Sequence, residues 1–520
     1  MMKKNILPLV CKHILLRLSA WILLVAIAGP LPLSANEDAW LLPTNAPDKA
    51  ARQTINSSQS HGAAPGHPHP PIRISERKKV PQPDVLIAKV KWGLTASNNP
   101  VSDWDLATND FKYFMETGSK TLGMTYAGGV VTLDSFSYDP SLTPALLISG
   151  VRTFKLTETE HASLKSYIQR GGMVICDSVY GSPYFYDSCK KVFQDMFPSK
   201  ALRVIPGDHP LFDIYEKITE MSYPEEPERK EPHMEGIYVG SRVGVLISKY
   251  GLGPGWTGNT EVVNELKKRG LKPQYIAPNS AKQFGINLYA YIVGYGEVGK
   301  IEGTPEVFLS VDEKRPTDEF VFAQIEHEGA WDVHPTASAT LLSKLRQESA
   351  VRVNLKRIVV HLDKDELSAI PFLYLTGLDD FTFSPTEVEA LRQYLKKGGK
   401  LFINNGLGLA AFHQAVMREM EKVLEGKAKM MPIPAKHEIF SSLKPIKEVE
   451  YTDALLAINP ELKTRPNLLG VEGENGLQII YSPYDIEAGW LDAFYPLMRG
   501  LKSPSATDLG MNIVTYMMMY

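Results

Sequence analysis

Hydrophobic and polar positions follow the same order twice along this chain. A short apolar run, Ala145–Ser149, ends at a glycine and is followed by an amphipathic helical pattern, a Gly-Gly pair and a second apolar run. The same order returns from Phe372 without a gap, and Gly150 corresponds to Gly377, 227 residues later. Apolar runs of this length that flank a helix are typical of strands buried within a parallel sheet. The pattern therefore predicts two copies of one strand–helix–strand unit.

Each predicted helix carries a start signal and a stop signal. Thr157–Glu160 and Ser384–Glu387 both fit the capping box, in which a hydroxyl and a carboxylate satisfy free backbone N–H groups reciprocally. Gly171 and Gly398 stand where the helices should end, at positions that favour a left-handed residue. The duplication extends over whole domains, because further pairs correspond: Trp104-Asp105 with Trp331-Asp332, Gly255-Trp256 with Gly489-Trp490, and Phe284–Tyr291 with Leu509–Tyr516.

The duplication divides most of the 520 residues into two domains, residues 84–300 and a more divergent copy at 304–520. A hydrophobic content of 44% and a charged content of 22% are ordinary for globular domains with real cores. The predicted fold class is α/β, with two tandem three-layer domains built on mainly parallel sheets. Because duplicated domains often keep an ancestral dimer contact, a pseudo-twofold pairing of the two copies is our hypothesis for their arrangement.

The first 35 residues have the pattern of an export signal. Lys3 and Lys4 precede an apolar segment, Leu18–Gly29, and Leu33–Ala35 offers small residues for cleavage. The apolar segment is short for a membrane span. We therefore expect export to the periplasm or the cell exterior. The alternative is an uncleaved N-terminal anchor, and we expect membrane contact only through that segment.

Residues 36–83 are rich in Pro, Ser, Ala and Gly and show no apolar periodicity, which predicts a disordered linker. His61, His67 and His69 lie within it and could catch a metal ion weakly, but a soluble tether is the favoured interpretation. The net charge of −3 and the lack of a basic run with interleaved aromatics argue against nucleic-acid binding.

Cys176 and Cys189 are the cysteines that follow the predicted export signal. They could form a disulfide in an oxidising compartment. Cys176 ends a predicted buried strand and Cys189 lies in the following helix, so the favoured interpretation is two buried thiols.

The first copy contains LLISG, a helix with the pattern E-x-x-x-L-x-x-Y, the Gly-Gly turn, an acidic strand end and the tripeptide Asp-His-Pro within Ile205–Phe212. With these features the chain resembles the bacterial domain-of-unknown-function family 4159, clearly over residues 84–300 and in a more divergent form over 304–520. The second copy has His437 without the flanking Asp and Pro. The resemblance implies a flavodoxin-like fold of the class I glutamine amidotransferase type and implies no established activity.

Asp177, Asp208 and His209 are the candidate site residues. Ligands of open parallel sheets bind at the carboxyl ends of the strands, near the point where strand order reverses. Asp177 follows the predicted strand Met173–Cys176 and the other two follow Leu202–Ile205, so the three side chains could converge. Two carboxylates and an imidazole can hold a divalent metal ion and leave positions open for water.

Two observations weaken an enzymatic interpretation. Asp208–Pro210 also fits a capped turn in which the Asp bonds backbone N–H groups, and this interpretation is favoured over a metal site. Cys176 lacks the small-residue elbow of a nucleophilic cysteine, and the second copy has Ile403 at the equivalent position. A site, if present, would belong to the first domain, because Lys436 replaces Asp208 in the second.

The sequence favours an exported, non-catalytic binding or assembly module of the bacterial envelope, with a protein or glycan partner; it assigns no cofactor, and a divalent metal ion is possible. The alternative is a metal-assisted hydrolase or a sugar-modifying enzyme with its site at the strand ends of the first domain. Substitution of Asp177 and His209 separates the two interpretations, since an enzyme would lose activity and keep its fold.

Overall fold

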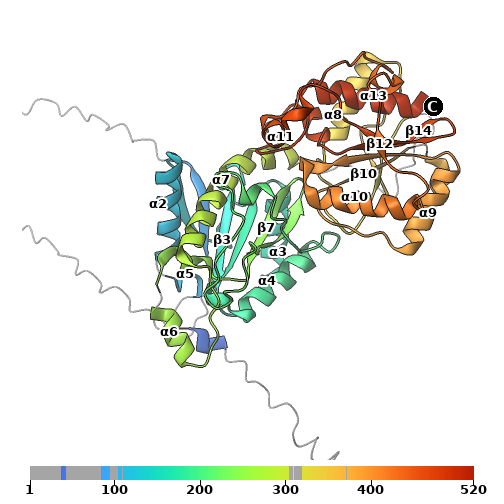
Figure 1. The fold of residues 1–520 in the computed structure, drawn as a ribbon. Coiled ribbons are helices and arrows are strands. Elements are labelled where there is room, and N and C mark those ends of the chain that lie inside the picture. Colours follow the sequence, from blue (N-terminus) through green and yellow to red (C-terminus); the bar gives the residue numbers. More distant parts are fainter. Residues whose placement is uncertain are drawn as a thin grey trace, which may run out of the picture.

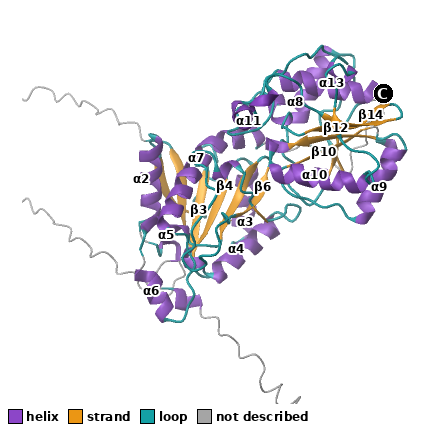
Figure 2. Ribbon diagram, viewed as in Figure 1, coloured by secondary structure: helices purple, strands orange, loops and turns teal. Residues whose placement is uncertain are grey.

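The computed structural model describes residues 37–41, 83–93, 103–107, 109–259, 261–303, 308–309, 319–370 and 372–519. These residues form two α/β domains that lie next to each other along the molecule (Figure 1). Each domain has a seven-stranded sheet with helices on both faces (Figure 2). The predicted fold class is therefore confirmed. The predicted export signal and most of the predicted linker lie outside the described residues.

The first domain consists of the following strands and helices in chain order: β1 (Val85–Lys91), α2 (Asp110–Leu122), β2 (Ala127–Thr132), β3 (Ala145–Gly150), α3 (Glu158–Gln169), β4 (Met173–Ser178), α4 (Pro183–Met196), β5 (Arg203–Val204), β6 (Glu235–Val239), β7 (Arg242–Ser248), α5 (Leu252–Thr257), α6 (Glu261–Lys268) and α7 (Pro278–Glu302).

The second domain repeats this order with small differences: β8 (Ala323–Ile325), α8 (Ala337–Glu348), β9 (Ile358–Val360), β10 (Phe372–Gly377), α9 (Pro385–Lys396), β11 (Lys400–Asn405), α10 (Ala410–Val423), β12 (Met431–Pro432), α11 (Asp453–Ile458), β13 (Leu469–Gly473), β14 (Gly476–Ser482), α12 (Glu487–Trp490) and α13 (Ser505–Met519). None of the described helices is both long and apolar enough to cross a membrane.

The two sheets have the same topology. The first has the order β2-β1-β3-β4-β7-β6-β5, and the second has the equivalent order β9-β8-β10-β11-β14-β13-β12. The first five strands of each order pair in parallel, and the last two strands add antiparallel pairs at one edge. Strand order reverses beside β1 and β8, which places the topological switch point between β1 and β3 and between β8 and β10.

Side-chain alternation along the central strands builds one apolar core on each face of the sheet. Leu147 and Ile175 pack with α2, α5 and α7, whereas Ile148 and Val174 pack with α3 and α4. The second domain is layered in the same way, with α8, α12 and α13 on one face and α9 and α10 on the other. All these strand positions are buried, as the continuous apolar runs predict.

The local helix signals act as predicted. Thr157 and Ser384 are the N-caps of α3 and α9, and both form complete capping boxes with the Glu three residues later. Gly171 and Gly398 have φ angles of 116° and 89°, so the chain leaves both helices in a conformation that glycine adopts without strain.

The domains associate through unlike surfaces, so the hypothesis of a pseudo-twofold pairing is wrong. The first domain contributes residues near β5 and the end of α7, and the second contributes loops at the carboxyl ends of its strands. For example, the Tyr295 hydroxyl donates to the Pro496 carbonyl at 3.1 Å. Val333, Leu378 and Leu407 of the second domain belong to the same apolar core as the first-domain helices. The contact is heterologous, with a different patch from each partner.

A buried histidine joins the two domains at this contact. Nδ1 of His334 lies 3.0 Å from Glu302 at the end of α7, and Nε2 lies 2.9 Å from Asp485 of the second domain. All three side chains are at most 1% exposed. Burial alone would lower the pKa of His334, but the two carboxylates outweigh burial and raise this pKa well above 6.5. His334 is therefore a buried imidazolium that bridges a carboxylate from each domain.

Residues 37–41 pack on the first domain, within the segment that the sequence analysis treats as a linker. Glu37–Trp40 forms a single 3₁₀ turn, and Trp40 and Leu41 are 6% and 7% exposed. The Glu37 carboxylate accepts hydrogen bonds from the Thr153 backbone N–H at 2.9 Å and from its hydroxyl at 2.7 Å. These residues contact the loops that follow the strands of the first domain.

We expect His334→Gln to lower the free energy of unfolding by about 3–5 kcal/mol near pH 6, because it leaves two buried carboxylates without their cation. A raised pKa contributes stability that is fully present below the unfolded value of 6.5 and is lost as pH rises through the folded value. Burial alone would raise the pKa of Asp485, but the positive charge of His334 outweighs burial and lowers this pKa below 3.8. The stability that this pKa shift contributes is lost only as pH falls below 3.8. The cost of the substitution should therefore shrink from pH 6 to pH 9 in denaturant titrations.

His327→Gln is the matched control, because burial lowers the pKa of His327 to about 4. That histidine is neutral in the folded state, so its effect on stability should change with pH in the opposite direction between 4 and 6.5. A cost of His334→Gln that stays constant or grows toward pH 9 would contradict the buried imidazolium.

Candidate functional site

Asp177 lies at the carboxyl end of β4, in register with Ser149 of β3 and Ser248 of β7. Its carboxylate is fully buried and accepts hydrogen bonds from the backbone N–H groups of Leu252 at 2.7 Å and Gly253 at 2.9 Å. These are the first residues of α5, whose N–H groups have no partner within the helix. Burial raises the pKa of Asp177 to about 7, although the two hydrogen bonds oppose the shift. The carboxylate thus caps a buried helix.

The second domain keeps this cap with an amide. Asn404 is the counterpart of Asp177, and its carbonyl oxygen accepts a hydrogen bond from Ile486 N–H at 3.0 Å, beside α12. Its amide group donates to Asp485 at 3.2 Å, and Asp485 accepts the N–H of Glu487 at 2.8 Å. An amide accepts a hydrogen bond but transfers no proton near neutral pH. The property that the two copies share at this position is therefore helix capping.

A buried ion pair lies next to Asp177 on the same face of the first sheet. Lys89 of β1 and Asp110 at the start of α2 are both 1% exposed, and Nζ lies 2.6 Å from Oδ1. Asp105 adds a second carboxylate at 3.5 Å. This pair was not predicted, although the lysine inside the strand run VLIAKVK is a signal for it, since strand lysines are rarely buried without a partner. Asp110 adds negative charge that raises the pKa of Asp177 further.

The second domain places a different cation near the equivalent position. Gln324 replaces Lys89, and it accepts a hydrogen bond from the buried guanidinium of Arg357, which also pairs with Asp332 at 2.9 Å. Glu487 is the neighbouring buried carboxylate, and burial raises its pKa to about 7. Each domain therefore has a cation and carboxylates at its switch point, but different residues supply them in the two copies. This is the pattern expected of charges that balance one another inside the protein.

His209 is buried near the opposite end of the sheet from Asp177. Its Nδ1 accepts the Leu211 N–H at 3.2 Å and so caps the turn Pro210–Phe212. Burial lowers the pKa of this imidazole to about 3, and the nearby positive charge of Arg499 lowers it further. His437 caps the equivalent turn of the second domain, with its Nδ1 3.2 Å from Ile439 N–H. The predicted capped turn is present, but the capping side chain is the histidine.

Asp208 points to the second domain. Its carboxylate accepts the Ala410 N–H at 2.9 Å, at the first residue of α10, and pairs with the Arg499 guanidinium at 3.0 Å. This use differs from the expectation that Asp208 bonds backbone N–H groups of its own turn. The sequence could not reveal it, because both partners lie more than 200 positions further along the chain.

The three candidate side chains are not brought together. Asp177 is level with Ser248 at the carboxyl end of β7. The His209 ring instead packs on Tyr238 and Tyr291, with centroid distances of 5.6 and 5.8 Å, and Tyr238 pairs with Val243 near the start of β7. Within the described part of the chain, no group of three or more His, Cys, Asp or Glu side chains has an arrangement suited to a metal ion.

Cys176 and Cys189 are both buried free thiols, as the favoured interpretation predicts. They pack in the same apolar core, between the sheet and the helices α3 and α4. Burial raises the pKa of the Cys189 thiol well above 9, so this thiol carries no thiolate character at neutral pH.

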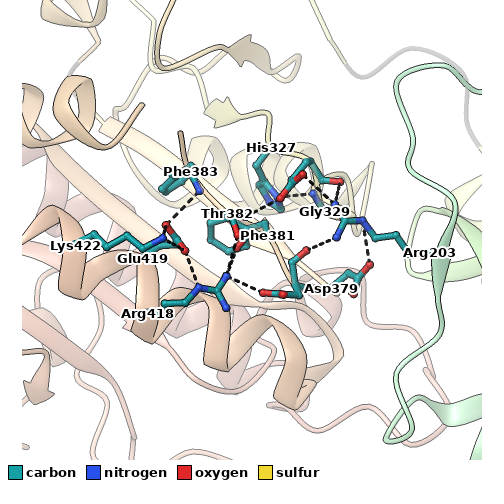
Figure 3. Close-up of polar contacts among 12 residues, drawn as sticks. Arg203, His327, Gly329, Asp379, Phe381, Thr382, Phe383, Arg418, Glu419 and Lys422 are labelled. Atoms are coloured by element: carbon teal, nitrogen blue, oxygen red, sulfur yellow. Dashed lines mark hydrogen bonds and ion pairs between the residues drawn. The ribbon is translucent and has the colours of Figure 1, made fainter. Parts of the chain in front are cut away.

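A second polar cluster lies where the first domain meets the loops that follow β8 and β10. Figure 3 shows Arg203 of the first domain reaching toward Asp379, whose carboxylate lies 3.6 Å from the guanidinium. The Arg203 guanidinium also donates to the Glu328 and Asp380 carbonyls at 2.9 and 3.0 Å. His327 accepts the Gly329 N–H and lies 2.9 Å from the Thr376 carbonyl, so both of its ring nitrogens are occupied. This cluster acts as a domain contact.

Comparison with protein families gives one match. The sequence model described as "Domain of unknown function (DUF4159)" matches residues 87–293 and again residues 321–518. These two matches cover most of the chain, so it belongs to this family and carries two tandem copies of its domain. A search of curated proteins found no match.

We expect the free energy of unfolding to decrease in the order wild type, Asp177→Asn, Asp177→Ala. The amide can keep one of the two backbone hydrogen bonds and the methyl group keeps neither, and each unpaired buried N–H costs about 1–3 kcal/mol. Because the folded pKa of about 7 lies above the usual 3.8, the wild-type advantage over Asp177→Asn should shrink as pH rises between these values. Denaturant titration at pH 4 and pH 8 measures both effects.

Asp195→Asn, at an exposed position of α4, is the control and should change stability little at either pH. Equal costs for the Asn and Ala variants at position 177 would contradict the helix-capping role.

Proposed function

We propose that this member of the family is an exported, non-catalytic binding or assembly component of the bacterial envelope. The observation that carries the proposal is a contact that the strand-end position makes in both domains. Side-chain oxygen atoms of Asp177 and Asn404 accept hydrogen bonds from backbone N–H groups at a helix N-terminus. Asn404 carries no ionisable group, and the contact that it shares with Asp177 is a hydrogen bond from a backbone N–H at the start of the following helix. This contact supports a structural, non-catalytic role for the strand-end position.

The domain contact supports the same proposal. Ion pairs and hydrogen bonds from Arg203, Asp208 and Glu302 reach the strand-end loops of the second domain. Open α/β enzymes use this edge of the sheet for their substrates. In the second domain, the first domain covers this edge, and the covered apolar side chains belong to a core that both domains share. The two domains therefore present a combined outer surface to a partner.

A relation to the class I glutamine amidotransferase-like, flavodoxin-like fold is part of the proposal. The identical strand order in both sheets and the switch point beside the first strand support it. Such enzymes place a nucleophilic cysteine on a sharp turn between strand and helix. Cys176 lies inside β4 and faces the core beneath α3 and α4, which supports a structural thiol.

We expect the chain, purified without a histidine tag, to contain far less than one divalent metal ion per molecule by elemental analysis. The Asp177→Asn variant should give the same value, because this carboxylate binds backbone N–H groups. A stoichiometric metal that is lost in Asp177→Asn would contradict the proposal. It would favour the metal-assisted hydrolase that the sequence leaves as the alternative.

The proposed export leads to a separate prediction. The protein recovered from its native cells should be found in the periplasmic or extracellular fraction, with Asn36 as its N-terminal residue. N-terminal sequencing of that fraction measures this directly. Recovery of the intact N-terminus from the membrane fraction would instead indicate an uncleaved anchor, and recovery from the cytoplasm would contradict export.

A further inference from the structure

The surface that residues 37–41 cover is built from the loops that follow β3 and β4 and from α6. We call it the strand-end surface of the first domain, and its apolar part consists of Leu106, Val151, Val179, Tyr180, Val263 and Leu266. Trp40 and Leu41 pack into this apolar part. Arg269, just after α6, donates to the Ala39 carbonyl at 3.2 Å and to the Leu41 carbonyl at 3.3 Å. The segment is therefore held through its side chains and through its backbone.

The second domain uses the equivalent surface to bind polypeptide as well. There the occupant is the first domain, and the covered side chains belong to the core that the two domains share. Tyr180 and its counterpart Leu407 even share a left-handed backbone, with φ angles of 54° and 53°. The equivalent apolar positions are Leu106 and Val333, Val151 and Leu378, and Tyr180 and Leu407.

The charge of the two surfaces is reversed. In the second domain Asp379 and the Asp380 carbonyl receive Arg203. In the first domain the equivalent positions are Arg152 and Thr153, and Thr153 donates both of its hydrogen bonds to Glu37. Arg152 and Lys155 add positive charge near Glu37, and the buried Asp103, 2.6 Å from the Arg152 guanidinium, offsets part of it. The duplicated surface thus holds a cationic side chain in one copy and an anionic side chain in the other.

We propose that the strand-end surface of the first domain is a peptide-recognition site for segments of the form Glu-x-x-Trp-Leu, and that Glu37–Leu41 occupies it in cis. The Thr153 N–H and hydroxyl donate hydrogen bonds to the carboxylate of the segment, and Arg269 donates to its backbone carbonyls. The apolar part of the surface packs against the aromatic and aliphatic side chains of the segment. This inference rests on the proposed function and deepens it, because it assigns the partner as an acidic–aromatic segment of another polypeptide. The tethered segment then competes with that partner.

Competition follows from the tether. Residues 42–84 connect the docked segment covalently to β1, and a covalent connection makes docking intramolecular, with an effective concentration up to about the millimolar range. A free peptide with the same contacts must compete with this tethered copy. Removal of the two anchoring side chains should therefore open the site to a peptide added in solution.

The probe is a fluorescein-labelled peptide with the sequence of residues 36–42, NEDAWLL, and the protein is the full chain in its natural processed form. In fluorescence anisotropy, the Glu37→Ala/Trp40→Ala double variant should bind this peptide at least about tenfold more tightly than the wild type does. Peptides that carry Glu37→Lys or Trp40→Ala should lose at least about tenfold in affinity for the double variant, since each removes one of the two recognition elements.

Arg269→Ala in the double-variant background should weaken peptide binding, because it removes the donor to two peptide carbonyls. Lys268→Ala removes the same charge at the neighbouring, exposed position and should leave binding unchanged. Should the double variant fail to fold, Glu37→Gln serves in its place. It removes only the charge, and it should raise the affinity for the labelled peptide relative to the wild type.

Absence of peptide binding by a folded double variant would overturn the inference, as would equal binding of the NEDAWLL peptide and its Glu37→Lys and Trp40→Ala forms. That failure would remove the assigned partner and leave the proposed function standing. The proposed function fails on a different result, a stoichiometric metal ion lost with Asp177→Asn.

Discussion

The placement of His334 between Glu302 and Asp485 is the contact on which the arrangement of the two domains depends. It buries one cation and two carboxylates at the junction, and breaking such a group leaves a buried charge without compensation. The same junction carries Asp208 on the N-terminus of α10 and a shared apolar core. Because these contacts use unlike patches of the two copies, the duplication produced a directional arrangement in which the first domain covers the strand ends of the second.

This arrangement of the two domains bears directly on the candidate site. The carboxyl ends of parallel strands expose polar groups and free helix N-termini, and enzymes of this architecture leave them open to a substrate. Here Asp177 and Asn404 satisfy helix N-termini internally, while the loops above them bind polypeptide. In the second domain that polypeptide is the first domain, and in the first domain it is the segment at Glu37–Leu41. Both strand-end surfaces are thus covered by polypeptide of the same chain, and the proposed recognition site rests on this shared feature.

Local signals in the sequence predicted local structure well. The capping boxes at Thr157 and Ser384, the central buried strands and the two free cysteines are all present in the structure. Contacts between distant segments escaped prediction. Asp208 binds residues of the other domain, and nothing in the tripeptide Asp-His-Pro indicates this. The charge pairs at the switch points use different residues in the two copies, so comparing the copies position by position does not reveal them.

Hydrogen exchange at two backbone amides tests most directly whether polypeptide covers both strand-end surfaces. The Thr153 amide donates to Glu37, and the Ala410 amide, which begins α10, donates to Asp208 across the junction. Neither amide has a partner in regular secondary structure, so its protection reports the docked contact. We predict slow exchange at both amides, with Glu37→Ala accelerating exchange at Thr153 alone. Rapid exchange at either amide in the wild-type chain would contradict this prediction.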